Sequence, residues 1–208
     1  MFNINSVINI NDKFNINMHN TLIDIINIQR KKEINNNIWK NSIYKDLPLL
    51  QSNNVGIVGE MLIQKICKDN NIISSIDGAK TKTEKIGDGF INNKSVEIKT
   101  SHLGCSGNSF QHELGEFPWN SNYIIFIDVS PTIVYIVIFK NFTENEYKQN
   151  NFKCIPYFPT KSITRRKKIG NFKLDTSINI NEKCVLNGYA IKTNNFKSVS
   201  KFIKNNII

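Results

Sequence analysis

Two short apolar runs dominate the middle of the chain, and both have the length of β-strands. Tyr123–Val129 and Thr132–Phe139 are almost entirely apolar, and Ser130-Pro131 separates them. Runs of this length that are bounded by turn residues are typical of strands buried in a sheet. Upstream, residues 86–100 alternate between apolar and polar positions around Asn92-Asn93. This pattern predicts a β-hairpin with the two asparagines in its turn.

Helical periodicity marks the segments on either side of these strands. Residues 55–67 carry apolar side chains at i, i+3, i+4 and i+8, and residues 18–34 carry a similar stripe. Ser198–Asn206 has the pattern of a basic helix, and Asn187-Gly188 predicts a second hairpin across residues 183–192. The pattern therefore predicts an α/β fold, in which a mixed central β-sheet holds the first hairpin in its middle and is flanked by helices.

The organisation along the chain predicts one domain over residues 1–208. We expect residues 1–45 to form a helical N-terminal arm. The alternatives for its role are a clamp, a dimer element and a packed helix. Residues 46–140 form the core, and residues 141–208 form a basic C-terminal portion that begins with a short polar helix at 141–150. A chain of 208 residues is long enough to bury a sizeable core.

The charge of the chain favours a polyanionic partner. Lys and Arg number 27 against 17 acidic residues, which gives a net charge of +10. The whole chain is rich in Ile, Asn and Lys, as expected of an AT-rich coding sequence, so local clustering is more informative than the total. The densest cluster is Arg165, Arg166, Lys167 and Lys168. Arginine reads guanine edges and clamps phosphates, so we expect this cluster to bind DNA, the alternative being a solvated charged loop.

Cysteine usage and hydropathy give the expected compartment. The four cysteines are widely spaced and form no C-x-x-C pair, so a structural zinc site is not expected. No run is long enough to span a bilayer, and the N-terminus has no signal-peptide pattern. We therefore expect a cytoplasmic protein without a membrane partner.

The chemistry is concentrated in the first predicted hairpin. Asp88 precedes its first strand, and Glu97 and Lys99 lie two residues apart in its second strand. Side chains of a strand repeat with period two, so Glu97 and Lys99 share a face, and the turn brings Asp88 back beside Glu97. Two carboxylates with an amine suit a hard cation such as Mg²⁺ and a water held near a phosphate. A surface hairpin with one salt bridge is the alternative.

These residues carry a resemblance to a known family. Gly87-Asp88 followed by Glu97-Ile98-Lys99 resembles the PD-(D/E)XK nuclease motif, with glycine in place of the proline. In that family a helix before the hairpin often brings a glutamate to the site, and the Gly-x-x-Gly-Glu sequence that ends at Glu60 looks like that helix. The helix dipole alone would also favour Glu60 near a helix start. Across about residues 50–140 the order of segments is similar to that of type II restriction endonucleases.

The resemblance implies a function and a set of site residues. Asp88 and Glu97 would ligate Mg²⁺, with the Ile98 carbonyl as a further ligand and Mn²⁺ as a substitute. Lys99 would position the attacking water, and Glu60 would complete the acidic site. The expected activity is site-specific cleavage of double-stranded DNA that leaves 5′-phosphate and 3′-hydroxyl ends.

The segment after the hairpin is polar and rich in glycine, so we expect a loop over residues 101–119. Within it, the residues expected to contact DNA are Ser101, His102, Asn108 and Gln111. The alternatives for Gln111 are a contact with the metal-bound water and a loop amide satisfied within the protein, and the alternative for His102 is an ordinary polar loop residue.

Cleavage of a palindromic site implies a homodimer, and a restriction system implies a cognate DNA methyltransferase. Two other functions stay open. One is a junction-resolving or repair nuclease of the same superfamily, and the other is a DNA-binding protein without catalytic activity.

Overall fold

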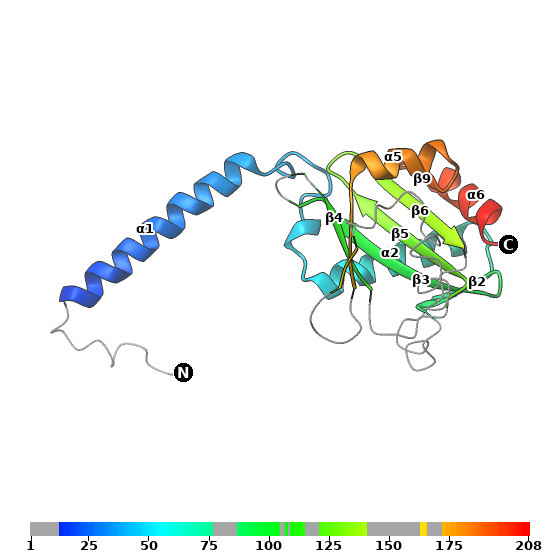
Figure 1. Cartoon of the computed structure of the whole chain (residues 1–208), viewed down its shortest axis with the longest axis horizontal. Coiled ribbons are helices and arrows are strands. Elements are labelled where there is room, and N and C mark those ends of the chain that lie inside the picture. Colours follow the sequence, from blue (N-terminus) through cyan, green and yellow to red (C-terminus); the bar gives the residue numbers. More distant parts are fainter. Residues whose placement is uncertain are drawn as a thin grey trace.

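The computed structural model describes most of the chain as a sheet-centred body from which one long helix projects (Figure 1). The described residues are 13–76, 87–104, 107, 109–114, 121–140, 163–165 and 172–208, with backbone only for 13–17, 163–165, 172 and 173.

Four α-helices and one short 3₁₀ helix occur in these described ranges. They are α1 (Lys13–Asn36), η2 (Leu47–Leu49), α2 (Ser52–Asp69), α5 (Ile178–Leu186) and α6 (Phe196–Asn206). The strands are β1 (Ser74–Ile76), β2 (Gly89–Ile91), β3 (Lys94–His102), β4 (Phe110–Leu114), β5 (Tyr123–Val129), β6 (Val134–Lys140), β7 (Ile163–Arg165), β8 (Phe172–Thr176) and β9 (Ala190–Lys192).

The central sheet is mixed, as the sequence predicted. Its strand order is β1-β2-β3-β5-β6-β9, and β3 and β5 run parallel while the other neighbours are antiparallel. The β2–β3 hairpin therefore lies inside the sheet. Every residue of β5 is buried, as expected for a strand covered on both faces.

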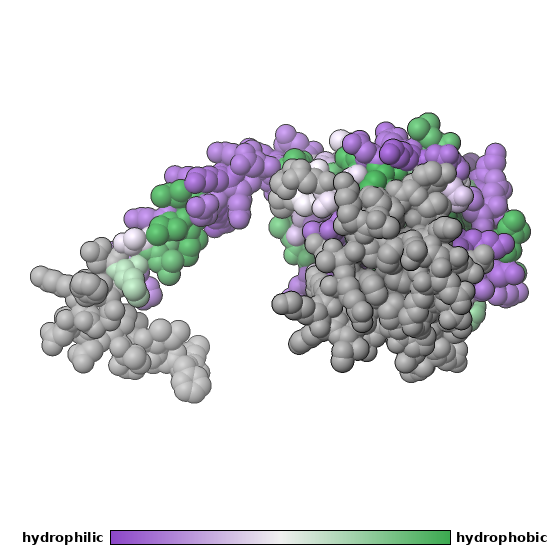
Figure 2. Space-filling model, in the orientation of Figure 1, coloured by the Kyte–Doolittle hydropathy of each residue, from purple (hydrophilic) through white to green (hydrophobic). Residues whose placement is uncertain are grey.

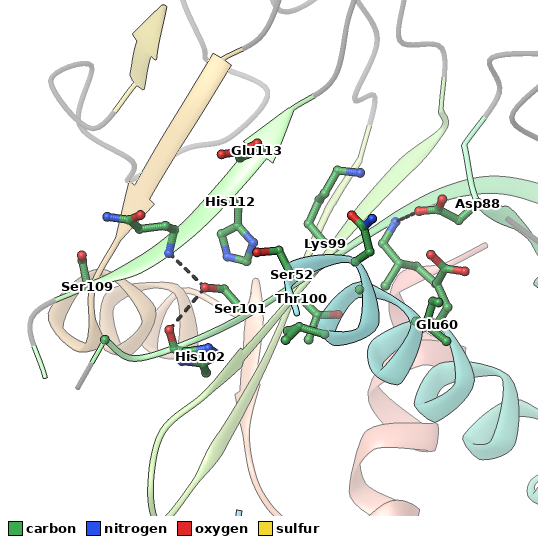
Figure 3. Close-up of a pocket in the computed structure, with 17 residues that line it drawn as sticks. Ser52, Glu60, Asp88, Lys99, Thr100, Ser101, His102, Ser109, His112 and Glu113 are labelled. Carbon is green, nitrogen blue, oxygen red and sulfur yellow. Dashed lines mark hydrogen bonds between the residues drawn. The ribbon is translucent and has the colours of Figure 1, made fainter. Parts of the chain in front are cut away.

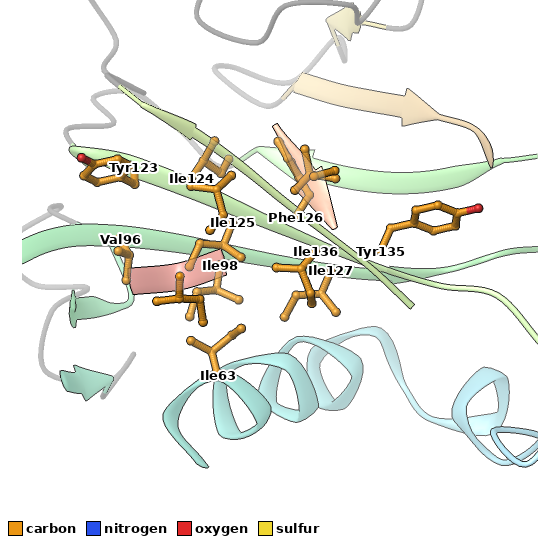
Figure 4. Close-up of a cluster of buried hydrophobic side chains, with 14 of the residues drawn as sticks. Ile63, Val96, Ile98, Tyr123, Ile124, Ile125, Phe126, Ile127, Tyr135 and Ile136 are labelled. Atoms are coloured by element: carbon orange, nitrogen blue, oxygen red, sulfur yellow. The ribbon is translucent and has the colours of Figure 1, made fainter. Parts of the chain in front are cut away.

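Different layers cover the two faces of this sheet. On one face α2 packs closely, and Figure 4 shows its Ile63 pointing toward Ile98 of β3. On the other face lies a three-stranded sheet of order β4-β8-β7, whose His112 stacks on Phe126 of β5 at 4.8 Å between ring centroids. Helix α5 joins this second layer through Asn181, which donates a hydrogen bond to Asp128 of β5. Helices therefore lie on both faces, which agrees with the prediction.

Two local predictions were wrong. Asn187-Gly188 does not form a hairpin turn: Asn187 caps the end of α5, and Gly188 follows with φ of +78° before β9. A residue with positive φ commonly follows the end of a helix and also occurs in the turn of a tight hairpin. The Asn-Gly dipeptide alone therefore does not distinguish a helix end from a hairpin turn. The expected loop over residues 101–119 contains the end of β3 and all of β4, where the sequence Phe-Gln-His-Glu-Leu alternates between buried and exposed positions. The short helix expected at residues 141–150 lies outside the described residues.

In the part of the chain that the structure describes, no helix combines the length and apolarity needed to cross a membrane.

Candidate acidic site in the β2–β3 hairpin

The turn of the hairpin is formed by two left-handed asparagines. Asn92 and Asn93 have φ of 49° and 61°, the conformation of a two-residue type I′ turn. This turn fixes the register, in which Gly89 of β2 lies opposite Val96 of β3. The predicted hairpin is therefore confirmed, and its register places the residue before Gly89 near Glu97.

Asp88 forms hydrogen bonds with the two residues that flank Glu97 in β3, Val96 and Ile98. Its backbone N–H donates to the Val96 carbonyl at 2.8 Å, and its Oδ2 accepts from the Ile98 N–H at 2.7 Å. Because these partners flank Glu97 in β3, Asp88 must lie beside Glu97. Asp88 is only 4% exposed, so its carboxyl group is held in place and largely shielded from bulk water.

Glycine at position 87 has a structural reason. Gly87 has φ of +108°, and a Cβ there would lie 2.4 Å from the Val96 carbonyl oxygen and 2.6 Å from the Ser121 hydroxyl. Proline, with φ fixed near −65°, cannot adopt this backbone. Glycine is therefore required at position 87 by its positive φ and by how closely the chain passes β3 here.

Lys99 lies among the acidic groups. It forms an ion pair with Glu97, two residues away on the same strand. Burial by itself would lower the pKa of Lys99, but the charges of Glu97, Asp88 and Glu60 together outweigh it and raise the pKa above the ordinary lysine value. Lys99 is therefore paired with Glu97 and lies within the electrostatic influence of Asp88 and of Glu60 on α2.

Helix α2 brings Glu60 to the site through a close contact with β3. A Cβ on Gly59 would lie 1.7 Å from Thr100 Oγ1 and 2.9 Å from Thr100 Cβ. Only glycine permits this approach of the helix to the strand. Because Glu60 follows Gly59 directly, the contact fixes how far Glu60 stands from Lys99.

Asp88, Glu60 and Lys99 line one part of an open pocket of about 890 Å³, and Glu97 is not among the described residues that line it. Figure 3 shows Asp88 and Glu60 toward one end, Ser101, His102 and Ser109 toward the other, and Lys99 between them. The start of α2 and the strand β4 complete the wall. The remaining lining residues are Ser52, Asn53, Val55, Gly56, Ile57, Ile98, Thr100, Gly104, Gln111, His112 and Glu113.

At the far end of the pocket Ser101 connects two strands. Its buried Oγ accepts a hydrogen bond from the Gln111 N–H at 3.0 Å and donates one to the His102 carbonyl at 3.4 Å. The Ser101 hydroxyl is thus engaged within the protein, whereas the Gln111 side chain is exposed at the pocket. His102 is half-buried beside them, and its ring Nδ1 lies 2.8 Å from the Leu103 carbonyl.

Behind this end of the pocket a buried carboxylate links the two sheets. Asp128 Oδ1 lies 2.7 Å from His112 Nε2, and Asp128 Oδ2 accepts from Thr176 Oγ1 at 3.1 Å and from Asn181 Nδ2 at 2.7 Å. The side chains of Asp128 and His112 are fully buried. The four residues come from β5, β4, β8 and α5, so this network holds the small sheet against the central one.

The predicted basic cluster is placed only at its beginning. Arg165 is the last residue of β7 and lies opposite Phe172 of β8, in the same sheet as Gln111. Arg166, Lys167, Lys168 and Asn108 lie outside the described residues. The prediction that these residues bind DNA stays a prediction.

The ligand set of the acidic site is suited to one kind of cation. No group of three or more His, Cys, Asp or Glu side chains placed to hold a metal ion occurs among the described residues. The carboxylates whose charges act on Lys99 are those of Asp88, Glu97 and Glu60, and a carboxylate binds a cation through its oxygens. Mg²⁺ takes oxygen ligands, keeps several waters and is usually bound by one or two carboxylates together with substrate phosphates. The residues present fit Mg²⁺ bound in that way.

Sequence reasoning predicted Glu60 and Gln111 at the site but missed other residues of the same two elements, α2 and β4, that line the pocket. Ser52 and Asn53 line it from the start of α2, and Glu113 lines it from β4. The alternation in Phe110–Leu114 was available as a strand signal and would have placed Gln111 and Glu113 on one face. Nothing local to Ser52 indicates that α2 begins at a pocket.

The chain matches no protein-family model, no curated protein and no solved structure.

Proposed function

We propose that this chain is a Mg²⁺-dependent, site-specific endonuclease of double-stranded DNA with a restriction-endonuclease-like core. The observation that carries the proposal is that Asp88 is hydrogen-bonded to Val96 and Ile98, the two neighbours of Glu97. At the same place the charges of nearby carboxylates act on the Lys99 cation, and Asp88 and Lys99 both line an open pocket. A buried carboxylate that is fixed beside a second carboxylate and a lysine suits the hydrolysis of a phosphodiester.

Each residue has a proposed role. Asp88 and Glu97 would hold Mg²⁺, with the Ile98 carbonyl as a further ligand, and bound Mg²⁺ would polarise the phosphate and lower the pKa of a water. The Lys99 ammonium would orient the attacking water and stabilise the charge that develops on the phosphate oxygens. Glu60 would keep Lys99 protonated and in place. The products would carry 5′-phosphate and 3′-hydroxyl ends.

The proposed substrate is suggested by the pocket and the charge of the chain. With a net charge of +10 the chain is attracted to a polyanion. Gln111 and His102 would contact DNA at the far end of the pocket, and Arg165 and the basic residues after it would read or clamp the duplex. One acidic site in each chain would cut one strand, so a homodimer would cut both. A site-specific nuclease of this type would be accompanied by a cognate DNA methyltransferase.

The test is cleavage of a mixed-sequence plasmid with Mg²⁺, Mn²⁺, Ca²⁺ or chelator. We expect discrete fragments with Mg²⁺ and Mn²⁺, and neither Ca²⁺ nor chelator should support cutting. Asp88→Asn and Lys99→Met should each lower the cleavage rate by at least about 100-fold, as expected for removal of a group that stabilises the transition state, and DNA binding should persist. Asp69→Asn is the matched control, because Asp69 lies at the far end of α2 in an exposed ion pair with Lys65.

The outcomes separate the alternatives. Cutting of branched DNA alone would favour a junction-resolving or repair nuclease, and binding without any cutting would favour a DNA-binding protein without catalysis. Full activity in chelator, or full activity of Asp88→Asn, would refute the proposed chemistry.

A further inference from the structure

Helix α1 is exposed along its whole described surface. Each side chain from Met18 to Asn36 is classed as exposed, and Figure 1 shows the helix pointing away from the body. Its large apolar side chains remain about half accessible: Leu22 is 52% exposed, Ile25 50% and Ile26 54%. Figure 2 shows such apolar surface along the helix.

The apolar residues form one continuous stripe. Met18, Leu22, Ile25 and Ile26 follow one another at i, i+4, i+7 and i+8, the spacing of a single helix face. Asp24 comes two residues after Leu22, about 200° around the helix axis, and so lies away from the stripe. No charged residue interrupts the stripe between Met18 and Ile28.

A helix of this kind needs a partner. The helix is 24 residues long, but helices in proteins draw most of their stability from packing an apolar face against the rest of the structure. The apolar face of α1 packs on none of the described residues. The length is about 36 Å at 1.5 Å per residue, which is enough for several turns of continuous contact.

We propose that the partner is a second copy of this chain, and that two α1 helices pack stripe to stripe. The chain carries a net charge of +10, so most basic surfaces would repel one another in a pair of copies, whereas this stripe is uncharged. The absence of cations on the stripe also makes it a poor surface for nucleic acid.

The available area is sufficient for such a pair. The four stripe side chains and Ile28, which flanks them beside Ile25, are each about half exposed or more. At roughly 100 Å² of burial each, two copies would bury about 1,000 Å² in total, which is near the lower limit for a specific protein interface and typical of a weak dimer. The same stripe serves both chains, so the contact is self-complementary and closes as a two-fold dimer. The homodimer itself is part of the proposed function, on which this inference rests to that extent, and the inference adds the surface through which the two copies pair.

The experiment measures the mass of the full chain in solution by light scattering after size exclusion, over a concentration series. A dimer has twice the chain mass of 23.9 kDa. We expect a dimer for the wild type, and a monomer for Leu22→Lys/Ile25→Lys and for Ile26→Lys. The matched control is Asn27→Lys, because Asn27 is exposed and lies two residues from Ile25, about 200° around the axis, and nine residues from Met18, about 180° around it.

Tryptophan fluorescence during urea unfolding checks that the body is folded, because Trp39 is buried in it. Monomeric stripe variants should unfold at a similar urea concentration to the control, and their helical circular dichroism should fall as α1 frays. A monomeric wild type, a dimer that survives in the stripe variants, or a control that also dissociates would each overturn the proposal. Cleavage of DNA by the same variants is measured separately. A dimer that cuts no DNA would refute the nuclease proposal alone, and a monomer that still cuts DNA would refute the α1 contact alone.

Discussion

Two glycines of α2 provide a direct test of how the acidic site is built. Gly56 and Gly59 lie one turn apart in the same helix, and alanine at either position gains up to about 1 kcal/mol of helix propensity. A Cβ at Gly56 meets nothing within 4 Å. A Cβ at Gly59 meets Thr100 Oγ1 at 1.7 Å, Thr100 Cβ at 2.9 Å and Ile127 Cδ1 at 3.0 Å.

The contact at Gly59 cannot be relieved by a side chain alone. Thr100 can rotate its hydroxyl away, but its Cβ is fixed to the backbone of β3, so the helix or the strand has to move. Overpacking of this kind costs about 1–3 kcal/mol. Because the gain in propensity is common to both variants, Gly59→Ala should be less stable than Gly56→Ala by about 1–3 kcal/mol. At 2–4 °C for each kcal/mol, that is a difference of roughly 2–12 °C in Tm.

The assay is urea unfolding of both variants followed by circular dichroism. We expect Gly56→Ala to equal or exceed the wild type and Gly59→Ala to fall below it. Thr100→Ala should partly rescue Gly59→Ala, because it removes the atom at 1.7 Å. It removes no described hydrogen bond, since Thr100 Oγ1 is buried without a partner among the described residues.

The same pair tests the proposed function. Gly59→Ala displaces the helix next to Glu60, so in the proposed nuclease it should lower the cleavage rate more than Gly56→Ala at equal fractions of folded protein. Equal stability of the two alanine variants, or no coupling between Gly59→Ala and Thr100→Ala, would refute this account of how α2 meets β3.

Other positions give further expected outcomes. Asp128→Ala leaves three buried polar groups without their acceptor, so the free energy of unfolding should fall by about 3–5 kcal/mol, and a loss below 1 kcal/mol in denaturant unfolding would contradict the described network. Asn93 has φ of 61°, so in the same assay Asn93→Gly should be neutral or stabilising and Asn93→Val should be destabilising by about 1–2 kcal/mol. The reverse order of stabilities would argue against the type I′ turn. Burial raises the pKa of Cys67 to about 11 and that of Cys184 to about 12. Both thiols should therefore resist a maleimide at pH 8 until urea is added, which peptide mapping of the labelled sites would check. Their contribution to stability should be full below about pH 8.5 and be lost as the pH rises toward 11, which unfolding at several pH values would check.

The parts of the fold that the sequence predicted correctly depend on local information. Two left-handed asparagines and an alternating strand define the β2–β3 hairpin within residues 89–102. The stripe of α2 is likewise periodic over a short window, and β5 is a short run that is apolar throughout. Burial of one face decides the structure of the hairpin and of α2, burial of both faces decides that of β5, and the residue pattern reflects each directly.

The parts that were missed depend on contacts between distant segments. Strand β4 is five residues long and pairs with β8, about sixty residues later. The network of Asp128 with His112 and Asn181 spans three elements, and no spacing along the chain encodes it. The dipeptide Asn187-Gly188 supplies a left-handed residue, and whether a helix or a strand precedes it is decided by packing rather than by the dipeptide.

This division has a consequence for the candidate site itself. Asp88, Glu97 and Lys99 belong to one hairpin, so their mutual placement follows from local pairing and withstands changes elsewhere. The far end of the pocket instead depends on the Ser101 contact to Gln111 and on the sheet that contains β4. In the proposed nuclease, changes in the hairpin should therefore alter metal dependence and the cleavage step. Changes in β4 should alter which DNA is bound while leaving metal dependence intact, because β4 carries none of the proposed metal ligands.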